Sequence, residues 1–517
     1  MAAVRNLLFI MCDQLRHDYL SCGGHPTLKT PHIDALAARG VLFRNAFCTS
    51  AVCGPSRMSF YTGRYARTHG STWNGVPLPV DELTLGDHLR PLGLRVALAG
   101  KTHFVPDIQG MARLGLDPRS PETLLLRTGG FEPFDAYEGH VRPPDDAPYM
   151  RYLKTRYPGG DPWTGFVVGA EAPDGTTADG WLIRNAHLPA RVAEADSETA
   201  YMTDRAIAFI REQADKPWCL HLSYIKPHWP YLAPAPYHAM YPPETHLPIA
   251  RQIHEIADAH PVVAAYRRTD EGQSFEREDV ATNAKIAYMG LVKQIDDHIG
   301  RLTRFLAEAR RLDDTMIVFT SDHGDFLGDH WLGEKELFYE QAVRIPLIVV
   351  DPDPAAARGR IDDRFVEGID LLPTFIEAVG GTVPGHVIEG RSLLPLLRGG
   401  PAKAKDAVFC ELDYGFRRAR QALGRAPSDC RGYMVRTERW KYVEWPGFAP
   451  QLFDLDNDPG EYRDLGTDPG RAKIRREMKD RLFEWLEARP IRARLADAEV
   501  EDRTDTHRKR GIHIGIW

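Results

Sequence analysis

Short apolar runs that alternate with helix-like patterns are the feature of this sequence that most limits its fold. Five runs have the length and composition of buried strands: Leu7–Met11, Arg95–Ala99, Trp218–Tyr224, Met316–Thr320 and Ile345–Val350. Between them lie helical patterns at Ile33–Gly40, Leu83–Leu92, Thr203–Gln213, about Ala284–Arg310 and Ile369–Val379. Strands that alternate with helices in this way favour an α/β fold with a mostly parallel sheet.

Polar residues follow four of these strands directly at the carboxyl end. In chain order the pairs are Asp13 with Gln14, Lys101 with His103, Lys226 with His228, and Asp322 with His323. Because open parallel sheets bind ligands outside the carboxyl ends of their strands, we expect these side chains to meet at one rim. This rim is the predicted functional site.

The rim combines ligands for a divalent cation with several cationic side chains. Asp13, Gln14, Asp322 and His323 offer two carboxylates, an amide oxygen and an imidazole. This mixture suits Ca²⁺ or Mn²⁺, and the imidazole tilts the choice toward Mn²⁺. The other candidates supply cations and proton carriers around an anion: Arg57, Lys101, His103, His228 and Lys335. A metal ion there would act as a Lewis acid on an oxygen of the anion.

Each candidate also has an ordinary structural interpretation when it is considered alone. An aspartate after a strand often caps the next helix, and the segment Asp322-His323-Gly324-Asp325 is compatible with a solvated turn. Lone lysines lie on surfaces more often than they bind ligands, and a lone thiol such as Cys53 is commonly an inert core residue. The functional interpretation gains weight because all the candidates fall at one predicted rim.

The segment Cys53-Gly54-Pro55-Ser56-Arg57 places a nucleophile four residues before an arginine, with a proline that stiffens the turn. Residues 57–65 have the pattern of the start of a helix. A helix N-terminus presents free N–H groups and the positive end of its dipole, so it attracts anions. Arg57 adds a forked cation that matches a tetrahedral oxyanion. The segment therefore predicts a nucleophile beside an anion site.

This Cys-x-Pro-Ser-Arg segment resembles the signature of the type I sulfatases and the related phosphonate monoester hydrolases, which belong to the alkaline phosphatase superfamily. In that family the cysteine is oxidised to formylglycine by a formylglycine-generating enzyme, and the hydrated aldehyde is the nucleophile. The resemblance extends along nearly the whole chain. Its other elements are Asp13-Gln14, Gly100-Lys101-Thr102-His103, Ser321-Asp322-His323-Gly324, Lys335, Arg439-Trp440-Lys441-Tyr442 and Leu452-Phe453-Asp454-Leu455.

The resemblance implies an alkaline-phosphatase-like fold, in which a large mixed sheet is flanked by helices and followed by a small C-terminal antiparallel sheet. It implies one divalent metal ion, Mn²⁺ or Ca²⁺. The implied metal ligands are Asp13, Gln14, Cys53, Asp322 and His323. The implied catalytic residues are Cys53, Arg57, Lys101, His103, His228 and Lys335.

The implied reaction is the hydrolysis of a sulfate monoester, as in an arylsulfatase, so a small anionic ester is the expected substrate. A hydroxyl of the hydrated formylglycine attacks, while Arg57, Lys101 and Lys335 stabilise charge on the nonbridging oxygens. His228 or Lys335 protonates the leaving alcohol. His103 then takes a proton from the second hydroxyl, which expels sulfate and restores the aldehyde.

Some positions leave neighbouring activities open. Gln14 and His323 stand where many sulfatases have an acidic residue and an asparagine, and they resemble phosphonate monoester hydrolases and choline-sulfatase-like members. The stretch 235–241 also resembles the phosphonate enzymes, whereas Lys101 and His103 resemble sulfatases. The alternatives are a phosphonate monoester hydrolase or phosphodiesterase with the same site, a metal-dependent phosphatase that uses unmodified Cys53, and an inactive binding protein on this fold.

The C-terminal part and two internal segments have a different character. Short strand patterns occur at Val408–Leu412, Gly432–Arg436, Trp440–Trp445 and Gln451–Leu455, and a helix pattern at Ile474–Ala488 follows them. Segments 105–195 and 230–280 are rich in proline, glycine and charge. We expect these two segments to form long loops over one end of the sheet, where substrate selection usually resides.

Length and composition set the remaining expectations. The 517 residues suffice for a catalytic domain over 1–400, a small-sheet domain over 401–500 and a tail over 501–517. A net charge of −7 gives no support for nucleic-acid binding, and no apolar run reaches the ~18 residues of a membrane span. Seven scattered cysteines without a CxxC pair favour a reducing cytoplasm. The apolar end Gly511–Trp517 predicts docking on a second copy, hence a homo-oligomer.

Overall fold

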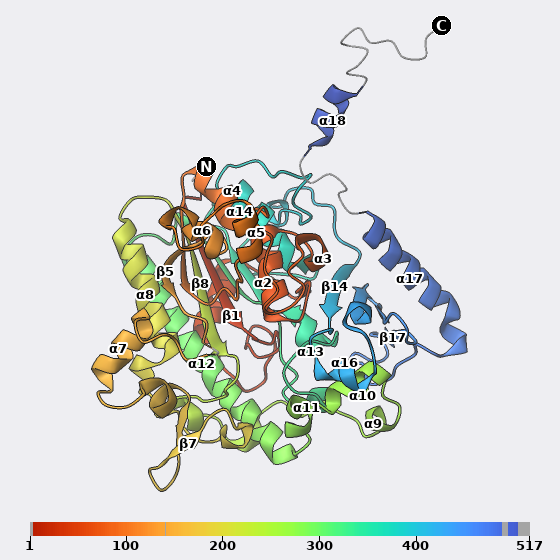
Figure 1. The fold of residues 1–517 in the computed structure, drawn as a ribbon, viewed down its shortest axis with the longest axis horizontal. Coiled ribbons are helices and arrows are strands. Elements are labelled where there is room, and N and C mark those ends of the chain that lie inside the picture. Colours follow the sequence, from red (N-terminus) through yellow and green to blue (C-terminus); the bar gives the residue numbers. More distant parts are fainter. Residues whose placement is uncertain (1–3, 140, 489–494, 505–517) are drawn as a thin grey trace.

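The computed structural model describes residues 4–139, 141–488 and 495–504. A large body contains the central sheet, and a smaller sheet with its own helix lies beside it (Figure 1). The predicted docking tail Gly511–Trp517 lies outside the described residues. Among the residues described, no helix has both the length and the apolar character needed to cross a membrane.

Within the described part of the chain, eight strands form the central sheet, in the order β12-β2-β11-β9-β1-β8-β4-β5. In chain order they are β1 (Asn6–Asp13), β2 (Val41–Phe43), β4 (Arg95–Gly100), β5 (Glu132–Ala136), β8 (Trp218–Pro227), β9 (Thr315–Ser321), β11 (Leu347–Val350) and β12 (Arg360–Asp362). The middle strand β1 runs parallel to β8 and β9, and β4 runs parallel to β8. Because β11 is antiparallel to both of its neighbours, the sheet is mixed, as the family resemblance implied.

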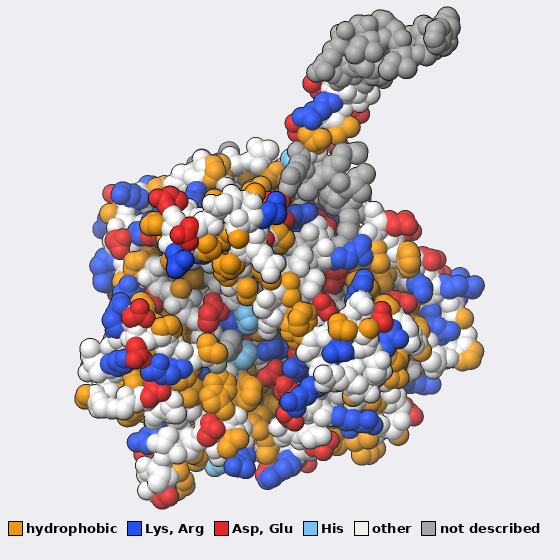
Figure 2. All heavy atoms as spheres, in the orientation of Figure 1, with side chains coloured by type: hydrophobic (Ala, Val, Ile, Leu, Met, Phe, Trp, Pro, Cys, Tyr) orange, Lys and Arg blue, Asp and Glu red, His pale blue; other side chains and the backbone are white. Residues whose placement is uncertain are grey.

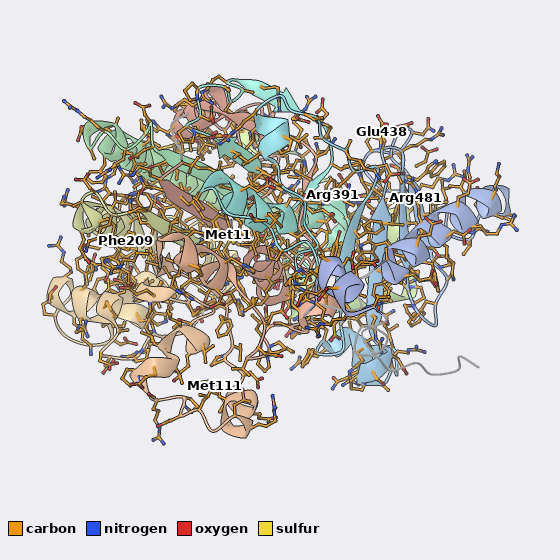
Figure 3. All side chains as sticks on the ribbon, turned by 90° about the horizontal axis from the view of Figure 1, so that it is seen from above. Met11, Met111, Phe209, Arg391, Glu438 and Arg481 are labelled. Carbon is orange, nitrogen blue, oxygen red and sulfur yellow. The ribbon has the colours of Figure 1, made fainter. Side chains whose placement is uncertain are left out.

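Helices cover both faces of this sheet, which explains why β1 is apolar from Leu7 to Cys12. On one face Leu7, Phe9 and Met11 belong to a core shared with α2 (Cys53–Thr62), α4 (Leu85–Leu89) and α14 (Leu371–Ala378). On the other face Leu8, Ile10 and Cys12 belong to a core shared with α1 (Pro31–Arg39), α8 (Glu198–Gln213) and α12 (Glu278–Glu308). Figure 3 shows Met11 in the interior of the large body, consistent with this packing.

The long helix α12 begins six residues before the predicted start at Ala284. Its first turn carries Glu278 and Asp279, whose negative charges stabilise the positive end of the helix dipole. Val280 and Ala281 of this turn are buried, but Thr282 and Asn283 interrupt the apolar pattern before Ala284, which is why that pattern alone placed the start too late.

The predicted strand Ile345–Val350 is two strands in different sheets. Residues Arg344–Ile345 form β10, which pairs with β3 (Ala46–Phe47) in a three-stranded sheet, whereas Leu347–Val350 form β11 of the central sheet. Pro346 lies between them and has no N–H for a ladder hydrogen bond, so the chain changes sheet at this residue.

The segments expected to be long loops contain more regular structure than their composition suggested. Segment 105–195 holds the edge strand β5, the helices α5 (Ile108–Arg113), α6 (Leu124–Arg127) and α7 (Pro148–Arg156), and the hairpin of β6 (Gly169–Glu171) and β7 (Thr177–Asp179). Segment 230–280 holds α9 (His254–Ala257), α10 (Pro261–Arg267) and α11 (Asp270–Ser274). Strand β5 was not predicted because Pro133 lies within it and proline is rare in strands. The proline is tolerated there because β5 is the outermost strand.

The smaller sheet is antiparallel and consists of β14 (Val408–Asp413), β15 (Arg431–Arg436), β16 (Trp440–Glu444) and β17 (Gln451–Asp454). Helix α17 (Ala472–Glu487) covers it through Met478 and Leu482. The sheet is tied to the large body by the fully buried Lys441. Its ammonium group lies 2.8 Å from Glu340 and 2.6 Å from Glu461, and it donates to the carbonyl of Phe338.

We expect Lys441→Met to lower the free energy of unfolding by about 3–5 kcal/mol. The methionine fills a similar volume but leaves the carboxylates of Glu340 and Glu461 without their shared cation. Urea-induced unfolding measures the loss. Lys479→Met is the matched control, because Lys479 pairs with Glu444 on the surface and should change stability by less than about 0.5 kcal/mol. Equal stability of the two variants would contradict the role given to Lys441.

Candidate active site

Helix α2 begins at Cys53 itself and not at Arg57 as predicted. Pro55 is compatible with this earlier start because the first-turn amides of a helix have no intrahelical acceptor. The helix ends at Gly63, whose φ of 66° is in the left-handed region. The sequence predicted free N–H groups at the N-terminus of this helix. One of them, the N–H of Gly54, instead donates to Asn74 Oδ1 at 2.7 Å.

Arg57 is fully buried and connects the carboxyl ends of four neighbouring strands. Its Nε donates to Asp322 Oδ2 at 2.8 Å, after β9, and its Nη2 lies 3.4 Å from Asp13 Oδ2, at the end of β1. Its Nη1 donates to the carbonyl of Lys101 at 2.9 Å, after β4, and to Ser223 Oγ at 2.8 Å, on β8. The strand ends therefore meet at one rim, as the sequence predicted.

Four of the predicted metal ligands lie together at this rim. Ligand atoms of Asp13, Cys53, Asp322 and His323 are all within 4.8 Å of one another, and all four residues are buried. The Cys53 sulfur is 3.1 Å from His323 Nε2 and 3.7 Å from Asp13 Oδ1. Only 1% of the Cys53 surface is exposed, so the thiol faces the cluster and not solvent.

The orientation of His323 is suited to metal binding. Its Nδ1 lies 2.9 Å from the carbonyl of Gly324, and a proton on Nδ1 leaves the Nε2 lone pair pointing at the cluster. Burial disfavours the charged imidazole, but the charges of Asp322 and Cys53 outweigh it and raise the pKa of His323 to about 9. A cation bound through Nε2 would therefore displace a proton.

Gln14 lies beside the four clustered residues and joins them to a carboxylate that the sequence reasoning missed. Its Oε1 accepts from Lys335 Nζ at 2.8 Å, and its Nε2 donates to Asp325 Oδ2 at 2.6 Å. The hydroxyl of Tyr231 donates to the same Asp325 oxygen at 2.6 Å. Burial raises the pKa of Asp325 to about 6, although its hydrogen bonds oppose the rise. Whether Gln14 also binds a metal ion stays a prediction.

Lys335 and His228 form a hydrogen-bonded pair at the site. The distance between Lys335 Nζ and His228 Nε2 is 2.9 Å, and His228 Nδ1 lies 2.6 Å from the carbonyl of Trp229. A proton on Nδ1 lets Nε2 accept from the ammonium group. Burial lowers the pKa of Lys335, but the charges of Cys53, Glu334 and Asp13 outweigh it and the pKa is raised, so Lys335 carries a charge.

Lys101 and His103 lie in the loop that follows β4. The ammonium group of Lys101 contacts Asp13 Oδ2. His103 has a positive φ of 55°, and its N–H donates to Glu138 Oε2 at 3.0 Å, so the loop is held in place. Burial, together with the charge of Lys101, lowers the pKa of His103 to about 3. The imidazole is therefore neutral near pH 7.

The thiol of Cys53 lies in a field that favours its ionised form. Burial and the charge of Asp13 raise its pKa, but Lys101, Lys335 and His323 outweigh them and hold the pKa below the usual value for a cysteine. By contrast, burial raises the pKa of Cys12 well above its usual value, even though this residue lies on the same strand as Asp13. The arrangement activates one cysteine and leaves the other inert.

Ser223, Asn74, Asp325 and Tyr231 contact the site but were not predicted as members of it. Asp325 follows the predicted pair Asp322-His323 by only two residues, so its position in the same motif was an available signal. Asn74 carried no signal, because it lies in an irregular stretch 20 residues from the amide it binds.

Comparison with known proteins identifies the family of this chain. The "Sulfatase" family model matches residues 5–381, and the model "N-sulphoglucosamine sulphohydrolase, C-terminal" matches residues 328–488. A multifunctional alkaline phosphatase superfamily protein, PehA of Trinickia caryophylli, is 33% identical over 97% of each chain. A choline-sulfatase of Rhizobium meliloti is 28% identical over 90% of this chain and 83% of its own.

Two solved structures have the same fold over nearly the whole chain. The phosphonate monoester hydrolase of Silicibacter pomeroyi has a TM-score of 0.83 at 32% identity, and it covers 93% of this chain and 95% of its own. The corresponding enzyme of Agrobacterium radiobacter has a TM-score of 0.79 at 29% identity with the same coverage. The chain therefore belongs to the sulfatase family of hydrolases, within the alkaline phosphatase superfamily.

Proposed function

We propose that this protein hydrolyses a sulfate monoester of an alcohol and that residue 53, oxidised to formylglycine, is the nucleophile. The observation that carries the proposal is the position of Cys53. It stands at the first residue of α2, faces Asp13, Asp322 and His323, and is surrounded by the charges of Lys101 and Lys335. A nucleophile held between a metal-ligating cluster and fixed cations suits attack on an anionic ester.

The residues present fit a divalent metal ion. Asp13, Asp322 and His323 would hold it together with the side-chain oxygen of the modified residue 53, and Gln14 would add an amide oxygen. Bound there, the ion would supply Lewis-acid polarisation of an ester oxygen and favour ionisation of the nucleophile. The two carboxylates and the amide suit Ca²⁺, and the imidazole favours Mn²⁺.

The cationic side chains divide into two roles. Arg57 uses its donors on Asp322, Lys101 O and Ser223, so we assign it the task of positioning the two carboxylates. Lys101 contacts Asp13 and Lys335 contacts Gln14, so both lysines adjoin the cluster. We assign these two lysines the stabilisation of charge on the nonbridging ester oxygens.

Two histidines are placed for proton transfer. The pair of His228 and Lys335 would protonate the leaving alcohol, and the hydrogen bond from His228 Nδ1 to Trp229 O keeps the imidazole oriented for this step. The neutral His103 would accept the proton from the second hydroxyl of the hydrated residue 53, which releases sulfate.

A phosphonate monoester is the second candidate substrate. Residues Gln14 and His323 resemble those of the phosphonate enzymes, and the two phosphonate monoester hydrolases named above align with 93% of this chain. Both ester classes carry a single negative charge on a tetrahedral centre, so the same residues could serve either one. Relative rates decide between them.

Rates on a panel of three esters test the proposal: 4-nitrophenyl sulfate, 4-nitrophenyl phenylphosphonate and bis(4-nitrophenyl) phosphate. We expect the sulfate ester to have the highest kcat/KM and all rates to fall on removal of divalent metal with a chelator. A higher kcat/KM on the phosphonate ester would favour the second candidate. Absence of hydrolysis of every ester by metal-loaded protein would contradict both.

The mass of the tryptic peptide that contains Cys53 tests the nucleophile. We expect a peptide that is lighter than the unmodified one by the difference between H₂S and one oxygen atom, because the thiol is exchanged for an aldehyde. Cys53→Ser should retain its unmodified mass and lose steady turnover, since a serine ester has no second hydroxyl to expel the product. Full turnover by protein with an unmodified Cys53 would favour the phosphatase alternative.

The pH dependence of a His103→Asn variant tests the base. We expect kcat to fall by about a hundredfold. Because the pKa of His103 is lowered to about 3, its basic form is fully present above that value and is lost only as the pH falls toward it. The ratio of wild-type to variant rates should therefore be constant from roughly pH 5 to 9. A ratio that drops tenfold per pH unit below pH 6 would show that His103 titrates near its ordinary value.

A further inference from the structure

We propose that a cavity beside the catalytic residues binds the leaving alcohol of the ester and selects an aromatic group. The inference rests on the proposed function, because that function places the leaving alcohol beside His228 and Lys335. The cavity has a volume of about 480 Å³. Its apolar lining consists mainly of Trp181, Leu182, Ile183, Trp229, Tyr231 and Phe275.

The cavity begins where the leaving oxygen would receive its proton. Trp229 directly follows His228, and its carbonyl holds the imidazole at 2.6 Å. Glu334 directly precedes Lys335, and its Oε2 lies 3.7 Å from the ammonium group. Tyr231 donates to Asp325, which in turn holds Gln14. Lining residues thus adjoin both members of the proton-donating pair, so an alcohol that leaves on this side enters the cavity.

Aromatic rings make up much of the wall. The rings of Trp181 and Trp229 meet edge to face with centroids 5.4 Å apart, and those of Tyr231 and Phe275 do so at 6.4 Å. Aromatic rings in this arrangement offer both faces and edges to a further ring. Tyr231 and Phe275 are buried and fix the floor, while both tryptophans are half-buried and accessible to a ligand. In Figure 2 apolar side chains gather in the lower middle of the face, below a hollow with histidines.

The charged residues of the lining have both signs: Asp270, Glu271 and Glu334 are acidic, and Arg184 and Arg277 are basic. Asp270 lies 3.7 Å from Arg418, and Glu271 lies 3.2 Å from Arg417. Glu334 faces Lys335 as described. Arg277 likewise pairs with Asp279 at 2.6 Å, so the aromatic rings form the main apolar surface that the cavity offers to a ligand.

The two segments that supply the wall were expected to select the substrate. Trp181, Leu182 and Ile183 come from segment 105–195, and Trp229 lies just before segment 230–280, which supplies Tyr231 and Phe275. These residues are far apart in the chain, and no part of the pattern in either segment predicted that they share a cavity.

Steady-state kinetics with two leaving groups test the inference. We expect Trp181→Ala to lower kcat/KM for a 2-naphthyl ester about tenfold or more, mainly through KM, and to change that for the ethyl ester less than about twofold. Trp181→Phe keeps a ring and should retain most of the activity on the 2-naphthyl ester. Trp440→Ala is the matched control, because Trp440 is also half-buried but lies on the small sheet. Equal losses on both esters would overturn the inference.

Binding of 2-naphthol, measured by calorimetry, tests the cavity without any turnover. We expect wild-type protein to bind 2-naphthol at least about tenfold more tightly than Trp181→Ala does. Equal affinity of wild type and Trp181→Ala would overturn the cavity assignment, even for an active hydrolase. Binding that depends on Trp181, in a protein that cleaves no ester of the panel, would contradict the proposed function and leave the cavity in place.

Discussion

The buried guanidinium of Arg57 is the group on which the arrangement of the site depends. It contacts Asp13, Lys101 O, Ser223 and Asp322, which lie at the ends of β1, β4, β8 and β9. Each strand end alone would leave polar groups in a region without water. A planar cation with five donors satisfies several of them at once, and lysine could not do so. The position of α2 follows from the same contacts, because Arg57 is part of this helix.

Burial of so many charges is tolerated because each of them has a partner of opposite sign or a hydrogen-bond donor. Asp13 meets Lys101 and Arg57, and Asp322 meets Arg57 and the backbone N–H of Gln14. A buried pair contributes little net stability, but loss of one member is costly. The cluster therefore adds little to the net free energy of folding. Lys441 uses the same kind of contact to join the small sheet to the body.

The sequence allowed the central strands and most of the rim to be predicted, because both depend on local signals. A buried parallel strand is a continuous apolar run, and the residue after it must lie at the sheet's edge. Contacts between irregular segments were missed for the opposite reason: nothing local connects Asn74 to Gly54 or Tyr231 to Asp325. The start of α2 and the strand β5 were missed because they contain Pro55 and Pro133. Proline usually interrupts helices and strands, but it is tolerated in the first turn of a helix and in an edge strand.

The depth of Cys53 has a consequence for the order of events in the cell. In the finished fold its sulfur is enclosed by Asp13, His323 and the first turn of α2, with 1% of the residue's surface exposed. An enzyme that oxidises residue 53 must reach this sulfur, which is buried once α2 has docked. If residue 53 is converted as we propose, conversion must come before folding is complete, and a molecule that folds first is trapped with its thiol.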